Sequence, residues 1–110
     1  MKYEEPKMIS YEEAIEIFSK ESSEKIADAI ISLALHDQNR LIVENWCLFW
    51  CNSNELEIRA ASVVAIGHLA RIHGKITKEV ILPALKLLEK EQGLQGVVSD
   101  ALDDIEVYCK

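Results

Sequence analysis

The stretch from Asn54 to Gly74, NELEIRAASVVAIGHLARIHG, restricts the fold of this chain more than any other stretch. Apolar residues recur in it at intervals of three and four, which is the pattern of one buried face of an α-helix. They are Ile58, Ala61, Ala65, Leu69 and Ile72. A second side carries mainly small residues: Ala60, Val63, Gly67 and Ala70. Because neighbours can approach such a helix from both sides, we expect it to be an inner helix of a helical stack.

Signals for the two ends of a helix flank this pattern. Asn54 and Glu57 predict a capping box, in which the Asn54 side chain accepts a hydrogen bond from the Glu57 backbone and the Glu57 carboxylate reaches back. Gly74 predicts the end of the helix, because glycine adopts the left-handed conformation without steric cost. Upstream, residues 41–51 are apolar on almost every side and predict a helix covered on more than one face.

The first third of the chain predicts two helices after a flexible polar leader at residues 1–9. Ser10 and Glu13 form a second capping-box pattern, which starts a helix expected to run to Lys20. Two consecutive serines then end that helix and start the next one, which is expected to run to about His36.

The last third of the chain predicts two more helices. Thr77 is expected to cap a helix that runs to about Glu91 and contains Pro83. Proline inside a helix removes a backbone hydrogen bond, so this segment is predicted to bend or to start at Ala84. The final helix is expected to turn the following residues inward: Val97, Ala101, Leu102, Ile105 and Tyr108.

A shift of 36 residues superimposes the inward positions of the central helix on those of the final helix. The matched pairs are Ile58 with Leu94, Ala61 with Val97, Ala65 with Ala101, Ile66 with Leu102, Leu69 with Ile105, and Ile72 with Tyr108. A period of this size is typical of HEAT and armadillo repeats. The sequence therefore predicts an all-α solenoid of three helical hairpins, at about residues 10–36, 39–73 and 77–109, within a single domain spanning residues 1–110.

Residues 58–69, IRAASVVAIGHL, resemble the second helix of a HEAT repeat, which has an aliphatic–arginine pair, small residues at mid-helix and then Leu-Gly. The resemblance implies a right-handed α-solenoid in which Arg59 has a structural role and holds an acid of a neighbouring repeat. Gly67 and Gly74 are structural residues in the same interpretation. The acid usual in the turn is replaced by Asn52 and Ser53, so the partner of Arg59 stays open.

The composition is that of a folded domain with few reactive motifs. Hydrophobic residues make up 49% and charged residues 28% of the 110 positions. The first twenty residues carry five glutamates and no apolar stretch of a signal peptide, which favours a cytoplasmic location. Phosphate-binding loops, nucleophile motifs and metal-binding histidine pairs are absent, so we expect no enzyme activity, no cofactor and no metal site. Cys47 and Cys51, one turn apart, are expected to be reduced core residues.

The net charge of −7 is concentrated at the two ends of the chain. Residues 1–24 carry a charge of −4, residues 25–99 are neutral and residues 100–110 carry −3. A phosphate backbone requires the opposite sign, so direct nucleic-acid binding is disfavoured and a basic protein partner is favoured. No apolar run reaches the length of a membrane-spanning helix.

Four acids of the final helix are candidate partner-binding residues: Asp100, Asp103, Asp104 and Glu106. The three aspartates share one helix face at spacings of three and four, where like charges repel. Two interpretations stay open. The acids form a solvated face, relieved by Lys110 or by a bond to Arg59 or Arg71, or they form a patch for the arginines and lysines of a basic partner.

Two further pairs of residues are candidates for partner binding. Trp46 and Trp50 lie one helical turn apart, and either both rings fill the core or one rim is an interface anchor. His68 and Arg71 share one edge of the central helix with Val64. That edge is either a polar site or a solvated or inter-helix contact, and it pairs no nucleophile with a base.

Residues 67–74, GHLARIHG, and 93–108, GLQGVVSDALDDIEVY, are similar to short bacterial proteins of this architecture, some of them immunity proteins of contact-dependent growth inhibition (CDI) systems. The resemblance implies a cytoplasmic protein that binds the toxic C-terminal domain of a cell-surface effector, often a nuclease. We expect the chain to be monomeric before it binds. The alternative function is that of a HEAT-like adaptor or scaffold in regulation or assembly.

Overall fold

Six α-helices make up the computed structural model, which describes residues 7–110 and contains no strand in that range. Their bounds are Tyr11–Lys20 for α1, Ser23–His36 for α2, Arg40–Trp50 for α3, Leu56–His73 for α4, Lys78–Leu88 for α5 and Gln95–Tyr108 for α6. The predicted all-α fold is confirmed, whereas the boundaries of the three hairpins stay a prediction. Most of the predicted leader, residues 1–6, lies outside the described residues. Lys7 is tied to α2, because its carbonyl accepts a hydrogen bond from Ser32 Oγ at 2.6 Å.

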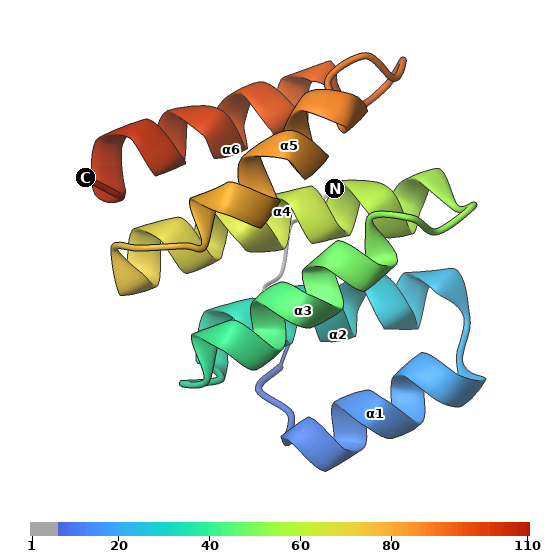
Figure 1. Ribbon diagram of the computed structural model, residues 1–110. Coiled ribbons are helices and arrows are strands. Elements are labelled where there is room, and N and C mark those ends of the chain that lie inside the picture. The colour runs from blue at the N-terminus through green and yellow to red at the C-terminus, as the bar shows by residue number, and fades with distance from the viewer. Residues whose placement is uncertain (1–6) are drawn as a thin grey trace.

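The helices form two layers, with α1, α3 and α5 in one and α2, α4 and α6 in the other (Figure 1). Consecutive helices pack on each other as α1 on α2, α3 on α4 and α5 on α6, and α4 also packs on α2 and α6. The chain thus advances by one pair of helices at a time, as in stacks of helical repeats that bury a continuous core. None of the helices described is long and apolar enough to cross a membrane.

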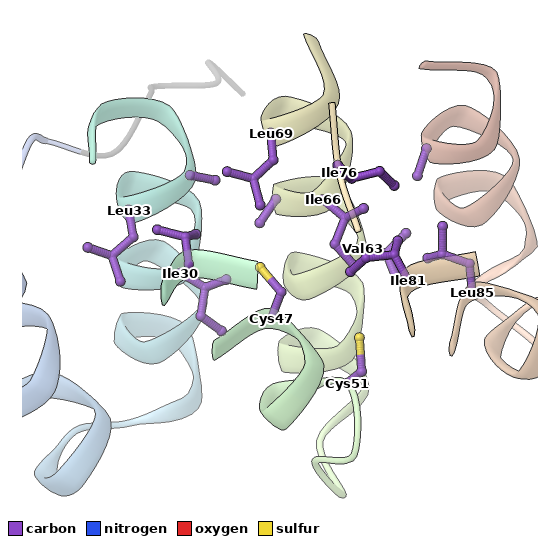
Figure 2. Packing of buried hydrophobic residues seen from close by; sticks show 14 of the residues in the cluster. Ile30, Leu33, Cys47, Cys51, Val63, Ile66, Leu69, Ile76, Ile81 and Leu85 are labelled. Atoms are coloured by element: carbon purple, nitrogen blue, oxygen red, sulfur yellow. The ribbon is translucent and has the colours of Figure 1, made fainter. Parts of the chain in front are cut away.

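The central helix α4 lies inside the stack, as its two-sided pattern predicts. Ala65, Ile66 and Leu69 are completely buried. Figure 2 shows Leu69 turned toward α2, while Val63 on another side of α4 is turned toward Ile81 of α5. Because α4 buries side chains on two sides, it joins the two halves of a single core. Burying one large aliphatic side chain contributes about 1.5–3 kcal/mol to stability.

Two of the predicted helix ends are confirmed. Ser10 Oγ accepts the Glu13 backbone N–H at 3.1 Å, and Glu13 Oε1 accepts the Ser10 N–H at 3.0 Å, which completes the capping box of α1. Gly74 ends α4 with a φ of 67°, in the left-handed region that favours glycine.

The predicted capping box at Asn54 is wrong. The N-cap of α4 is Glu55, whose side chain caps nothing, and the helix begins at Leu56. Ser53 Oγ accepts the backbone N–H of Glu55 at 3.1 Å and forms a local turn just before the helix. This competing turn moves the start of α4 one residue beyond the position that the NELE pattern predicts.

The buried stripes of α4 and α6 are shorter than predicted. Ile72 and Tyr108, expected inside, expose 52% and 47% of their surface. Both lie in the last turn of their helix, at the edge of the stack, where fewer neighbours can cover them. On α6, Val98 is completely buried, whereas Val97, predicted to point inward, is only half-buried. This helix is the last of the stack, and of the helices described it packs closely only on α4 and α5.

The proline of α5 lies within the helix, which begins at Lys78 and ends at Leu88. The predicted start at Ala84 and the predicted end near Glu91 are therefore wrong. Pro83 lies on the exposed side of α5, so the backbone carbonyl that loses its partner one turn earlier can bind water instead.

α3 is covered on more than one face, as its apolar sequence predicts, by α2 and α4 and by Phe18 of α1, but its outer side is open. Val43 and Cys47 are buried against the core, but Leu41 and Phe49 are exposed. The helix lies in the outer layer and packs on α2 and α4, which leaves its opposite side open.

One buried charge, not anticipated from the sequence, joins α3 to the loop before α5. The Glu44 carboxylate pairs with Arg40 and accepts the backbone N–H of Thr77 at 3.2 Å. Arg40 Nη1 also donates to Thr77 Oγ1 at 3.4 Å. Because a buried carboxylate is tolerated only when it is paired and hydrogen-bonded, these three residues act as one connection. Contacts with α3 therefore hold Thr77 in place just before α5, and the Thr77 side chain does not cap this helix.

Candidate functional site

An ion pair connects α4 and α6. Arg71 Nη1 donates to Asp104 Oδ2 at 2.6 Å. Gly67 makes room for this carboxylate, because a Cβ on Gly67 would lie 3.0 Å from Asp104 Oδ2 and 3.7 Å from the Ala101 backbone. The absence of a side chain at Gly67 therefore allows α6 and its acid to lie close against α4.

The same arginine contacts a histidine on its own helix. Arg71 Nη2 donates to His68 Nδ1, one turn earlier on α4. An arginine is always a donor, so Nδ1 of His68 is the acceptor in this bond. The three residues His68, Arg71 and Asp104 consequently form a continuous polar row across two helices. This row is the inter-helix contact that the sequence left open as one interpretation of the His68–Arg71 edge.

A shallow hollow of about 200 Å³ lies beside this row, between α4 and α6. Val64 and Val97 contribute apolar lining, and Asp100 and Asp104 contribute carboxylates. We define the α4–α6 surface as the following residues: Val64, His68, Arg71, Val97, Asp100 and Asp104. The structure thus brings together His68, Arg71, Asp100 and Asp104 from the sequence-based candidates.

The other two acids of α6 lie outside the lining of this hollow. Asp103 and Glu106 are exposed, as is Asp100. Within residues 7–110, none of these three carboxylates takes part in an ion pair. Asp104 therefore has a structural bond to Arg71, whereas the other three acids are open to solvent.

Trp46 and Trp50 lie elsewhere, on α3 against α1. Their ring centroids are 4.7 Å and 5.5 Å from that of Phe18. Trp46 Nε1 donates to the Tyr11 hydroxyl at 3.0 Å. Both indoles are half-buried in this aromatic cluster, so most of each ring packs inside the fold.

The exposed aromatic residue of this region is Phe49, which the sequence did not single out. Phe49 exposes 60% of its surface and meets Trp46 and Trp50 edge-on, with centroids 5.7 Å and 5.0 Å away. Helical periodicity places Phe49 opposite the buried Val43 and Cys47. Because the segment is apolar on nearly every side, that periodicity alone did not show which face is inside.

Arg59 does hold an acid, and this acid is Glu91 in the turn after α5. The distance from Arg59 Nη2 to Glu91 Oε1 is 3.1 Å. Arg59 Nη1 donates to the backbone carbonyl of Ser53 at 2.8 Å. The arginine therefore links the turn before α4 to the turn before α6, so the missing acid at residues 52 and 53 is replaced by a backbone carbonyl and a more distant carboxylate.

The cysteines are buried free thiols. Burial raises the pKa of Cys51 to about 12, and burial followed by the neighbouring Cys51 and Glu44 raises the pKa of Cys47 further. Thiols of this kind stay protonated at neutral pH and are poor nucleophiles and poor metal ligands. In the described part of the chain, no group of three or more His, Cys, Asp or Glu residues is arranged to hold a metal ion.

Comparison with known proteins shows a similarity to a solved structure. No protein-family model matches the chain, and no curated protein matches it. A chain in the crystal structure of a CDI complex from Cupriavidus taiwanensis LMG 19424 is similar, with a TM-score of 0.88 and 27% sequence identity. The similarity covers 98% of this chain and 96% of that chain, so the two correspond along nearly their whole lengths.

Proposed function

We propose that this chain is a cytoplasmic immunity protein that binds and neutralises the C-terminal toxin domain of a CDI effector. The observation that carries the proposal is the match, over nearly the full length of both chains, to a chain found in a CDI complex. The net charge of −7 favours the inhibitor over the toxin of such a pair, because a toxin that cleaves nucleic acid has to attract phosphate.

The α4–α6 surface supports a partner of basic character. Asp100 lies on it, and Asp103 and Glu106 add negative charge on the same helix. Exposed carboxylates attract lysines and arginines over a distance and accelerate association. A nuclease active site is itself basic, so an acidic surface of this kind can occupy it in place of the substrate. Val64 and Val97 would then supply apolar contact beside the charges.

The aromatic cluster supports a second contact. Phe49 is the exposed member, and its ring meets those of Trp46 and Trp50 edge-on. Aromatic side chains backed by a rigid cluster lose little conformational freedom when they bind, which is typical of interface anchors. The tryptophans are proposed to act mainly through Phe49.

Co-expression with the C-terminal domain of the effector encoded next to this chain tests the proposal. We expect that domain to stop growth when expressed alone, and growth to resume when this chain is present. The two purified proteins should elute together in size-exclusion chromatography. As a control, this chain expressed alone should not affect growth.

Absence of both a complex and a growth rescue would contradict the immunity function. A stable complex with a neighbouring-gene product that is harmless by itself would instead favour the adaptor function. The helical stack, in which Arg59 ties successive turns together, is equally suited to that second role.

A further inference from the structure

A hollow lies between α3 and α5, beside the first turn of α4. It has a volume of about 490 Å³, within the range of ~300–1,000 Å³ of ligand-binding clefts. α3 contributes Leu48 to its lining, and α5 contributes Ala84 and Leu87. Arg59 and Glu91 line its polar end. We call it the α3–α5 hollow.

Arg59, at the polar end of the α3–α5 hollow, is already bonded to its neighbours. Two nitrogens of the Arg59 guanidinium are bonded, Nη1 to Ser53 O and Nη2 to Glu91 Oε1. Arg59 Nε is inaccessible to solvent, and within residues 7–110 it has no hydrogen-bond partner. Because no solvent-sized atom reaches Nε, this nitrogen is closed to a binding partner, and Arg59 contributes a guanidinium held in place by Ser53 and Glu91.

The charges of the hollow cancel each other. Arg59 and Glu91 are paired, and the other lining residues are uncharged. A charged group entering the hollow would lose hydration without meeting an unpaired opposite charge, which makes its entry unfavourable. A neutral group with an apolar body fits this chemistry.

The surroundings of the hollow favour a polypeptide over a small molecule. Leu87 on its rim exposes 69% of its surface, and Phe49, the residue after Leu48, is exposed on the neighbouring helix. A small ligand inside the hollow would leave these two side chains in water. A protein segment laid across α3 and α5 would cover both and insert one side chain between them.

We propose that the α3–α5 hollow receives a neutral segment of the toxin domain, with an aliphatic or aromatic side chain seated beside Leu87. This inference rests on the proposed function, since its occupant is the partner named there. It assigns to the outer layer a contact that is separate from the α4–α6 surface and independent of charge.

Leu87→Asp and Ala84→Met test the proposal in the full chain, with the neighbouring effector's C-terminal domain as the probe. Leu87 is exposed, so its replacement should leave the fold intact, and methionine at position 84 fills the hollow without adding charge. Each should weaken binding by roughly tenfold or more, as expected when an anchoring contact is lost. The loss should persist at about 0.5 M salt, where charge effects are screened.

Val107→Asp is the matched control, because Val107 is also an exposed aliphatic residue but lies on α6. We expect it to weaken binding much less than Leu87→Asp. The dissociation constants come from calorimetric titration, with thermal melting as the check on folding. Unchanged affinity of Leu87→Asp and Ala84→Met, or an equal loss for Val107→Asp, would overturn the assignment of the hollow. Failure of the unmodified chain to bind the domain would instead overturn the proposed function, so the two failures are distinguishable.

Discussion

The α4–α6 surface and the α3–α5 hollow differ in how their charges are arranged. On the α4–α6 surface, Asp100 is exposed and forms no ion pair within residues 7–110. Asp103 and Glu106, on the same helix, are likewise exposed and without an ion pair in that range. In the second, Arg59 neutralises Glu91. Unpaired surface charge acts at long range and speeds association, whereas apolar contact acts at short range and slows dissociation. The two regions are thus suited to different steps of binding.

The largest effect is expected from a substitution that removes the scaffold shared by both regions. Ala65→Glu places an unpaired carboxylate at a completely buried position of α4. We expect a loss of about 4 kcal/mol or more in the free energy of unfolding, and loss of both binding surfaces. Circular dichroism during thermal denaturation measures the loss.

Ile72→Glu is the control for this substitution, because Ile72 is on the same helix but exposed. Its effect should stay within roughly 0.5 kcal/mol. Cooperative unfolding of Ala65→Glu at the temperature of the unmodified chain would mean that α4 does not occupy the centre of the core.

A smaller effect, confined to binding kinetics, should distinguish the two regions. Neutralising Asp100, Asp103 and Glu106 as Asn, Asn and Gln should lower the association rate with the effector domain by roughly tenfold at low salt. The dissociation rate should change little, in contrast to Leu87→Asp. Combining both sets of changes should give nearly additive losses, because the regions share no contact residue. Surface plasmon resonance at several salt concentrations measures both rates.

A second triple variant, with glutamine at Glu12, Glu16 and Glu24, changes the net charge equally on exposed positions of α1 and α2. It should leave the association rate closer to that of the unmodified chain. An equal reduction by both triple variants would attribute the acceleration to net charge alone and not to the acidic face of α6.

The smallest effect is expected at Asp104. Asp104→Asn removes an ion pair with Arg71, which is about two-fifths exposed, so the free energy of unfolding should fall by only about 0.5 kcal/mol. Urea denaturation measures this change, with Asp103→Asn as the unpaired control. An effect of Asp104→Asn on association as large as that of the triple neutralisation would assign this acid to the partner and not to the scaffold.

Local signals in the sequence predicted much of the fold because they act within one helical turn. The Ser10 capping box and the Gly74 terminus depend on hydrogen bonds and dihedral angles of adjacent residues. The failure at Asn54 has the same local origin, since Ser53 offers a competing turn to the same backbone. The start of α5 is not set by neighbouring residues, because Thr77 is held by Glu44 from a distant part of the chain.

The candidate site was predictable only in part. Periodicity placed Arg71 and the α6 acids on outward edges of their helices, and the 36-residue repeat placed those helices side by side. Which acid pairs with Arg71 depends on how closely α6 approaches α4 at Gly67. Helical periodicity carries no information about the distance between two helices. The α3–α5 hollow was missed because its lining combines segments far apart in the chain.

By itself the sequence determined that the chain forms helices and which helix lies at the centre, because spacings of three and four residues define a buried face. Only the tertiary structure decided which apolar residues are covered. Leu69 and Ile72 belong to the same predicted stripe, yet one is completely buried and the other is half in water. The physical reason is that exposure depends on how many neighbours surround a position, and these neighbours come from helices distant in sequence.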